Sequence, residues 1–204
     1  VWDSSSATPP RLPSNPDGRV SGARFSTDGS RILTWSGDGT AQVWGSTSSA
    51  ALPRLLINHD GGVYDALFST NGSRILTWSW YGTAQVWDSR TGKAITPPIE
   101  HEEEFVTGAR FSSDGSRVLT WTRGNEIDSG IGSGSARLWD SRTGKPLTPP
   151  LGHAGPVGGA QLNVDESRFR SWSDDGTARL WDRRSGVLLT PPLKHERSVE
   201  GAEF

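Results

Sequence analysis

A tandem repeat of about 42 residues runs through the whole chain and constrains its fold more than any other feature. One series of tryptophans follows Val or Leu: Trp2, Trp44, Trp87, Trp139 and Trp181. A second series follows Thr or Ser: Trp35, Trp78, Trp121 and Trp172. A third marker is an alanine within segments such as Gly-Ala-Arg-Phe: Ala23, Ala66, Ala109, Ala160 and Ala202. Nine of the ten tryptophans therefore occupy repeat positions, and only Trp80 does not.

Each repeat has the pattern of short antiparallel strands. Apolar and polar residues largely alternate over residues 31–36 and 41–44, which is the periodicity of a half-buried strand. Turn dipeptides precede the first of these segments in three repeats: Asp28-Gly29, Asn71-Gly72 and Asp114-Gly115. Asp165-Glu166 replaces the dipeptide once. With four short strands per repeat and no helical pattern, the sequence predicts the blades of an all-β propeller.

Composition excludes several classes of protein. The 25 glycines and 13 prolines leave little room for long helices, and the absence of cysteine excludes disulfides, thiolate metal sites and cysteine nucleophiles. A net charge of −2 gives no support for a nucleic-acid or anionic-membrane surface. No apolar run is long enough to span a membrane and no signal segment is present, so we expect a soluble segment and favour the cytoplasm, although the compartment is unknown. The chain starts with Val and contains no Met, so we expect it to be processed, excised or truncated.

These residues resemble the WD-repeat β-propellers along essentially the whole chain. The resemblance rests on a histidine before a strand, on Ser-x-Asp-Gly-Thr as at residues 173–177, and on the Trp-Asp pair that follows it at Trp181. The Thr-Pro-Pro-Leu segments that begin at Thr148 and Thr190 are similar to those of long bacterial WD-repeat arrays fused to signalling or conflict-system domains. The resemblance implies four-stranded antiparallel blades.

The resemblance also implies a hydrogen-bonded group of His, Ser or Thr, Asp and Trp in each blade. The fourth blade has the full set: His153, Ser173, Asp175 and Trp181. The first has Ser36, Asp38 and Trp44, with Pro16 in place of the histidine. The second has His59, Ser79 and Trp87, with Tyr81 in place of the aspartate. The third has His101, Thr122 and Trp139, and a ten-residue insertion displaces its aspartate. Each missing member is expected to weaken its blade by about 1 kcal/mol per hydrogen bond.

Family strand order gives four complete blades and one incomplete blade within a single domain, residues 1–204. The complete blades are expected at about 19–57, 62–99, 105–151 and 156–193. Residues 1–12 would supply two strands and residues 198–204 one strand of a further blade that lacks its second strand. Three interpretations stay open: a window from a larger propeller, a five-bladed ring missing one strand, or edges completed by other copies. We favour the first, because a domain boundary should not fall within a blade.

The polar residues give no sign of catalysis. All four histidines stand at the same repeat position, so a hydrogen-bonding role within each blade explains them better than a metal site or acid-base chemistry. We therefore predict no catalytic residue, no metal site and no cofactor. The acidic run at residues 102–104 is interpreted as a solvated loop, and the glycine-rich segment at residues 130–134 lacks the lysine of a phosphate-binding loop.

Departures from the repeat point to binding. Trp80 and Tyr81 stand where the first blade has Gly37 and Asp38. By family geometry these two aromatics should share one face with Tyr64, Phe105, Arg19 and the insertion at residues 123–134. Exposed aromatics are typical anchors of interfaces, so we predict a partner-binding surface there. The alternative is that Trp80 and Tyr81 only pack against the insertion.

Three functions stay open, and the first is favoured. The chain is interpreted as a non-catalytic scaffold for a protein or peptide partner within a larger bacterial protein. An alternative is a structural array that self-associates through open blade edges. A small-ligand or enzyme module that uses the central channel is a third hypothesis. The sequence identifies neither the partner, the total number of blades, nor the other domains of a parent protein.

Overall fold

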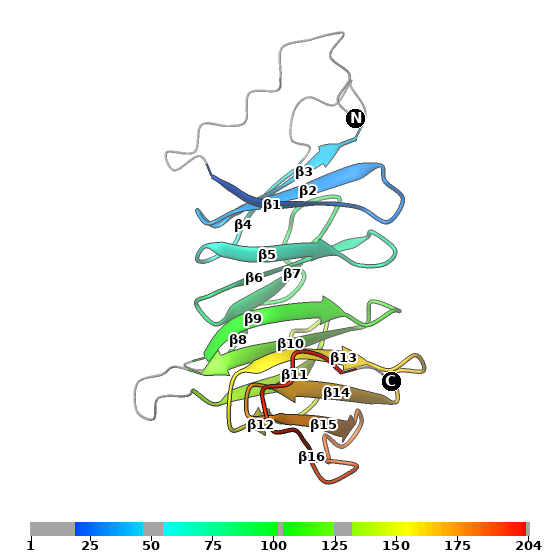
Figure 1. Cartoon of the computed structure of the whole chain (residues 1–204). Coiled ribbons are helices and arrows are strands. Elements are labelled where there is room, and N and C mark those ends of the chain that lie inside the picture. Colours follow the sequence, from blue (N-terminus) through cyan, green and yellow to red (C-terminus); the bar gives the residue numbers. More distant parts are fainter. Residues whose placement is uncertain (1–18, 47–54, 102–103, 125–131, 203–204) are drawn as a thin grey trace.

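The computed structural model describes residues 19–46, 55–101, 104–124 and 132–202. These residues form sixteen strands in four antiparallel four-stranded sheets, and the described part of the chain contains no helix. The sheets, here blades A to D, are stacked in chain order, with blade A and blade D at opposite ends of the stack (Figure 1). The all-β architecture of four-stranded blades is therefore confirmed.

The strands follow one another across each blade in chain order. Blade A consists of β1 (Val20–Phe25), β2 (Arg31–Ser36), β3 (Thr40–Gly45) and β4 (Leu55–Asn58). Blade B consists of β5 (Val63–Phe68), β6 (Arg74–Ser79), β7 (Thr83–Asp88) and β8 (Ile99–Glu100). Blade C consists of β9 (Glu104–Phe111), β10 (Arg117–Gly124), β11 (Gly134–Asp140) and β12 (Leu151–His153). Blade D consists of β13 (Val157–Leu162), β14 (Arg168–Ser173), β15 (Thr177–Asp182) and β16 (Leu193–Lys194).

The turns between the first and second strands explain the Asp-Gly and Asn-Gly pairs of the sequence. Gly29, Gly72 and Gly115 have φ of 68°, 68° and 70°, a left-handed conformation that favours glycine. The fourth turn has Glu166 at the same position with φ of 55°. The Glu166 carboxylate accepts a hydrogen bond from the Ser113 N–H at 2.5 Å, so this turn also joins blade D to blade C.

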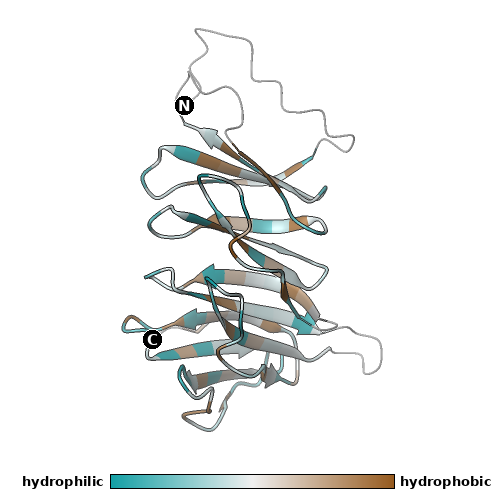
Figure 2. Ribbon diagram, turned by 180° about the vertical axis from the view of Figure 1, so that it is seen from behind, coloured by the Kyte–Doolittle hydropathy of each residue, from teal (hydrophilic) through white to brown (hydrophobic). Residues whose placement is uncertain are grey.

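Apolar side chains fill the space between neighbouring blades. The joint between blades A and B contains Leu33, Val43 and Ile57 from one side and Ile75 and Trp87 from the other. Equivalent cores lie between blades B and C and between blades C and D. Viewed from behind, apolar residues alternate with polar ones along the strands, as the period-two pattern predicts (Figure 2). Each blade thus buries its apolar residues only with the help of a neighbour.

The position before the repeated alanine requires glycine, because a tryptophan ring of the second strand lies against its backbone. A Cβ atom at Gly22 would lie 2.2 Å from the ring of Trp35 on the neighbouring strand β2. A Cβ atom at Gly108 would lie 2.1 Å from Trp121, and one at Gly159 would lie 2.2 Å from Trp172. The tryptophan of the second strand therefore packs directly on the backbone of the first strand.

Arginines at the start of the second strands also join neighbouring blades. Arg31 of blade A donates to the Gly72 carbonyl at 2.6 Å and to the Ser89 hydroxyl at 2.9 Å, both in blade B. Arg74 of blade B makes the same pair of contacts with Gly115 and Ser141 of blade C. These joints were not predicted from the sequence, although an arginine at this position recurs in every repeat.

Residues 198–202, the described part of the predicted strand at 198–204, are not in a strand in this structure. A strand needs a hydrogen-bonding neighbour, and none of the described strands pairs with these residues. The predicted strands within residues 1–12 lie outside the described residues.

Candidate interaction surface

Three of the predicted aromatic residues form one contiguous cluster. The rings of Tyr64 and Trp80 meet edge to face, with centroids 4.8 Å apart and an interplanar angle of 89°. The ring centroids of Trp80 and Phe105 are 6.2 Å apart. Tyr64 lies on β5 of blade B and Phe105 on β9 of blade C, so Trp80 joins two blades. We call Tyr64, Trp80, Tyr81 and Phe105 the aromatic cluster.

The turn between β6 and β7 places Trp80 and Tyr81 at the edge of blade B. The Tyr81 N–H donates to the Ser79 hydroxyl at 2.9 Å, and Gly82 has φ of 80°, so the chain reverses within three residues. A tight turn has no room to bury two large side chains. Trp80 is accordingly 45% exposed, and Tyr81 is 76% exposed.

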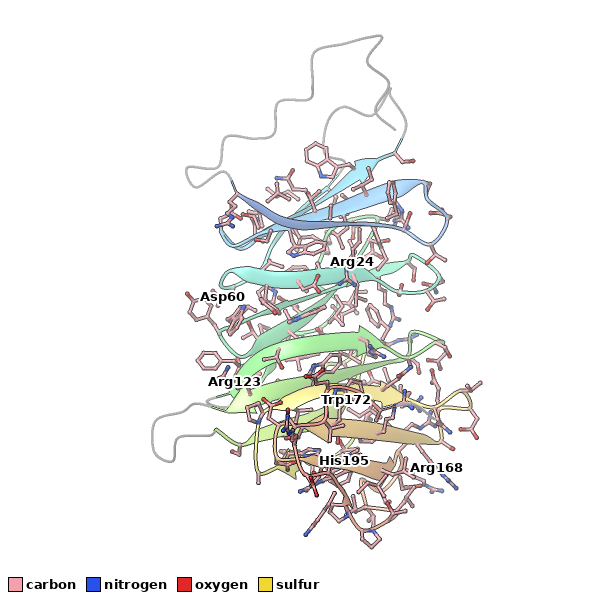
Figure 3. The ribbon with its side chains drawn as sticks, viewed as in Figure 1. Arg24, Asp60, Arg123, Arg168, Trp172 and His195 are labelled. Carbon is pink, nitrogen blue, oxygen red and sulfur yellow. The ribbon has the colours of Figure 1, made fainter. Side chains whose placement is uncertain are left out.

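Tyr81 extends the aromatic cluster along the same edge. A Cβ atom at Gly61 would lie 2.9 Å from the Tyr81 ring, so this ring rests on the Gly61 backbone. Asp60 and Arg123 lie along this edge in the stick view (Figure 3). Arg123 is paired in register with Phe105 across β9 and β10. The aromatic cluster is thus bordered by one acidic and one basic residue.

Arg19, another predicted member of this surface, stands apart from the aromatic cluster. Arg19 is exposed, and its carbonyl accepts a hydrogen bond from the Ser36 hydroxyl at 3.0 Å in blade A. No ring contact found among the described residues includes Arg19. Most of the insertion, residues 125–131, lies outside the described part, so the packing of Trp80 against it is not tested.

The histidine set of blade D links strands of two blades. The His153 Nε2 atom lies 2.7 Å from Ser171 Oγ, and the Trp181 indole N–H donates to the same hydroxyl at 2.9 Å. The His153 Nδ1 atom lies 3.2 Å from an Asp175 carboxylate oxygen. His153 belongs to β12 of blade C and its partners belong to blade D, so the set fastens one blade to the next.

The hydroxyl between His and Trp is not the predicted one. The predicted hydroxyl, Ser173, instead donates to the Gly155 carbonyl at 3.1 Å and accepts from the Asp175 N–H at 3.1 Å. Trp181 is paired with Phe169 across the sheet, and its indole reaches the next residue on the same face, Ser171. In the other blades, too, the hydroxyl that accepts the Trp indole N–H is not the predicted one. It belongs to Thr34 and not Ser36, to Thr77 and not Ser79, and to Thr120 and not Thr122.

Blade B compensates for its missing aspartate. His59 lies 2.7 Å from the Thr77 hydroxyl and 2.9 Å from the Thr83 hydroxyl, so both ring nitrogens have partners although Tyr81 stands at the aspartate position. The prediction that blade B is weakened therefore did not include the hydrogen bond between His59 and Thr83. His101 bonds Thr120 at 2.9 Å, and Trp139 donates to the same hydroxyl at 2.8 Å.

Burial controls the protonation of these histidines. Desolvation lowers the pKa of His59 from 6.5 to about 4, opposed only weakly by the Asp60 charge. Desolvation also lowers the pKa of His153, and there the Asp175 carboxylate opposes the shift. Burial acts to raise the pKa of Asp175, but hydrogen bonds from Thr177 and Ala154 hold it below its usual value. Both histidines are therefore neutral at pH 7, which suits a structural hydrogen bond.

Metal-binding side chains do not gather in the described part of the chain. No group of three or more His, Asp or Glu side chains in the described part of the chain could hold a metal ion. A pocket of about 460 Å³ lies between blades A and B. It is lined in part by Arg31, but that guanidinium is already bound to Gly72 and Ser89. The described part of the chain contains no helix that is long and apolar enough to cross a membrane.

Comparisons with known proteins agree with this architecture. The family model "WD domain, G-beta repeat" matches residues 10–45 and 52–88. The computationally designed Ika8 protein is similar in structure, with a TM-score of 0.71 and 21% identity over 91% of this chain and 52% of that chain. The C-terminal WD40 domain of Sif2 is similar with a TM-score of 0.67 and 19% identity, over 89% of this chain and 48% of that chain. No curated protein matches the chain.

The stacked four-stranded blades define the class of protein as a β-propeller. The chain spans about half the length of the two similar solved structures. The WD-repeat family model matches residues 10–45 and 52–88, and the His–hydroxyl–Trp contacts recur in blades C and D, beyond the matched residues. WD repeats generally act as scaffolds that bind protein partners, and the family is typically non-catalytic.

Proposed function

We propose that this protein is a non-catalytic scaffold that binds a protein or peptide partner through the aromatic cluster of blades B and C. The observation that carries the proposal is the contact of Trp80 with both Tyr64 and Phe105 while Trp80 is nearly half exposed. Large aromatic side chains that are rigidly held and partly exposed supply contact area at low cost in conformational entropy.

The repeat itself supports a binding role over a purely structural one. Blade A has Gly37 and Asp38 at the positions of Trp80 and Tyr81, and blade D has Asp174 and Asp175. Both blades form the same four-stranded sheet without aromatic residues in this turn. A four-stranded blade can therefore form without aromatic residues in this turn, which supports a role for the exposed Trp80 surface in binding another molecule.

The residues in and around the aromatic cluster favour a partner that binds through a short peptide segment with apolar side chains. Tyr64, Trp80 and Phe105 present ring edges and faces, and Asp60 and Arg123 border them with opposite charges (Figure 3). A bound segment would place an apolar side chain on the rings and polar groups at the two ends. We include Arg19 as a peripheral member of the proposed surface.

A peptide-display selection tests the proposal directly. Peptides selected on the wild-type chain are expected to bind the Trp80→Gly variant at least about 30-fold more weakly, which corresponds to the 2 kcal/mol typical of a hot spot. Leu56→Ala is the matched control, because Leu56 is an exposed apolar residue on β4 outside the aromatic cluster. Selected peptides that bind wild type and Trp80→Gly equally well, and all map elsewhere, would contradict the proposal.

A further inference from the structure

Tyr81 is the most exposed ring of the aromatic cluster and lies at one end of it. The rings of Tyr64, Trp80 and Phe105 contact one another, whereas no ring contact is found for Tyr81 in the described part of the chain. One side of the Tyr81 ring rests on the Gly61 backbone, and the residue is 76% exposed. The other side of the ring is therefore an open aromatic surface next to the three packed rings.

Two exposed carboxylates border the Tyr81 ring. Asp60 directly precedes Gly61, on which the ring rests. Glu100 is paired in register with Thr83 across β7 and β8, two residues along the chain from Tyr81. Asp60 thus comes from the segment that leads into blade B, and Glu100 comes from the last strand of that blade.

The register brings these carboxylates to the same side of the turn. Residues that are directly opposite in an antiparallel pair of strands have their side chains on the same face, so Glu100 shares the face of Thr83. The Thr83 hydroxyl donates to the Asp60 carbonyl at 3.5 Å, so that face is turned towards Asp60. The turn between β6 and β7 carries Tyr81 at the same edge of blade B.

Neither carboxylate is used to hold the fold. In the part of the chain that the structure describes, no hydrogen bond or ion pair is found for the side chain of Asp60 or of Glu100. Asp28 and Asp114, by contrast, accept hydrogen bonds from serines of their own turns. Two negative charges without a counter-ion beside an open aromatic ring attract a cation.

The other end of the aromatic cluster does not favour an acidic partner. Arg123 is paired in register with Phe105 at that end, but Arg123 already interacts with another residue of the chain. The residues that precede Phe105 in the sequence, 102–104, are all acidic. Charge complementarity therefore favours a basic partner over an acidic one.

We propose that the segment bound by the aromatic cluster is basic, and that a lysine or arginine side chain of this segment stacks on the open side of Tyr81 beside Asp60 and Glu100. This inference rests on the proposed function, because it names the chemistry of the partner of the same surface. The aliphatic part of the lysine or arginine side chain packs on the Tyr81 ring, and the charged end is attracted by the ring face and by the two carboxylates. An apolar neighbour in the segment then contacts Trp80.

Peptides selected from a random-peptide phage library on the wild-type chain are the probe, and they are expected to contain lysine or arginine. Replacing the critical lysine by norleucine, or the critical arginine by citrulline, removes the charge and keeps most of the shape. Binding should weaken at least about fivefold, since the cation–π contact and the attraction to the carboxylates are both lost.

The Trp80→Gly variant separates this inference from the proposed function. Peptides that lose binding to Trp80→Gly, but contain no basic residue or tolerate its replacement, would overturn the inference and leave the proposed function standing. Peptides that bind Trp80→Gly as well as wild type would contradict the proposed function, and this inference with it.

Tyr81→Leu and Tyr81→Phe test the place of the cation. Tyr81 is 76% exposed, so both variants are expected to fold, which circular dichroism checks. Tyr81→Leu keeps an apolar side chain without a ring and should weaken the lysine peptide at least about threefold, whereas Tyr81→Phe keeps the ring and should bind within about twofold of wild type. The norleucine peptide is the control and should bind wild type and Tyr81→Leu alike. An equal loss for the lysine and norleucine peptides would mean that Tyr81 makes only an apolar contact, and would overturn the inference.

Asp60→Asn and Glu100→Gln test the charges with little change in shape. Each variant should weaken the lysine peptide at least about twofold, and the loss should be smaller at high salt. Asp174→Asn is the matched control, because Asp174 is an exposed carboxylate in the corresponding turn of blade D, away from the aromatic cluster. Equal weakening by Asp174→Asn would indicate a general charge effect, and unchanged binding in both Asp60→Asn and Glu100→Gln would likewise overturn the inference.

Discussion

The Trp181 indole N–H donates to the Ser171 hydroxyl over 2.9 Å, and the same hydroxyl bonds His153 Nε2 at 2.7 Å. Replacement of Ser171 by Ala leaves both nitrogens buried without a partner. We expect a loss of about 2–4 kcal/mol in the free energy of unfolding, the cost of two unsatisfied buried groups. Urea denaturation at pH 7 measures it.

Ser171→Thr is the matched control for that variant. Threonine occupies the equivalent position in the other three blades, at Thr34, Thr77 and Thr120. The hydroxyl is retained, so the free energy of unfolding should change by less than about 1 kcal/mol. A Ser171→Thr variant as unstable as Ser171→Ala would mean that packing, and not the hydroxyl, determines the effect.

Trp80→Gly should leave the fold nearly unchanged. Trp80 is 45% exposed in a turn where blade A has Gly37, so its loss is a surface change of about 0.5 kcal/mol or less. For a chain of this length, that corresponds to a melting temperature within about 2 °C of wild type. A calorimetric decrease well beyond this range would show that Trp80 supports the fold, and would favour packing against residues 123–134 over partner binding.

The sequence predicted the blades because their determinants are local. Alternation of apolar residues and the glycines at Gly29, Gly72 and Gly115 specify strands and turns without reference to distant parts of the chain. The same pattern could not distinguish Ser171 from Ser173, since both lie on one face of β14. Only the cross-strand register, which pairs Trp181 with Phe169, shows which hydroxyl the indole reaches.

The aromatic cluster was predicted only in outline for a similar reason. Repeat positions placed Tyr64, Trp80 and Phe105 on one edge, but ring contacts depend on rotamers and on the spacing of neighbouring blades. Arg19 shares its repeat position with Phe105, yet blade A and blade C are separated by blade B. A repeat position specifies a place within a blade and not a neighbour in space.

Stability should decrease as the pH falls from about 6.5 to about 4. His59 has a folded pKa of about 4 against 6.5 when unfolded, so in this range the unfolded chain binds the proton and the folded chain does not. The full contribution is present above pH 6.5 and is lost progressively towards pH 4, on the order of 3 kcal/mol for this shift. The lowered pKa of His153 acts in the same direction.

Comparison with His59→Gln isolates this effect from the titration of aspartates. The difference between the urea unfolding free energies of wild type and variant should shrink as the pH falls from 7 to 4.5. Asp28 and Asp114, whose hydrogen bonds with neighbouring serines lower their pKa to about 2, affect both chains equally. A pH-independent difference would show that His59 is not desolvated in the folded chain.

The middle blades should be protected from hydrogen exchange for longest, even though blade D has the complete His153, Ser171, Asp175 and Trp181 set. Strand β6 lies in blade B between blades A and C, and all five of its residues after Arg74 are fully or almost fully buried. Strand β14 of blade D has a covered face towards blade C, but no further blade of the described residues lies against its other face. Local opening of β14 therefore exposes less apolar surface and costs less free energy than opening of β6. Exchange measured by mass spectrometry on the 204-residue chain should show slower exchange in β6 than in β14, and the reverse order would mean that the hydrogen-bonded set outweighs stacking between blades.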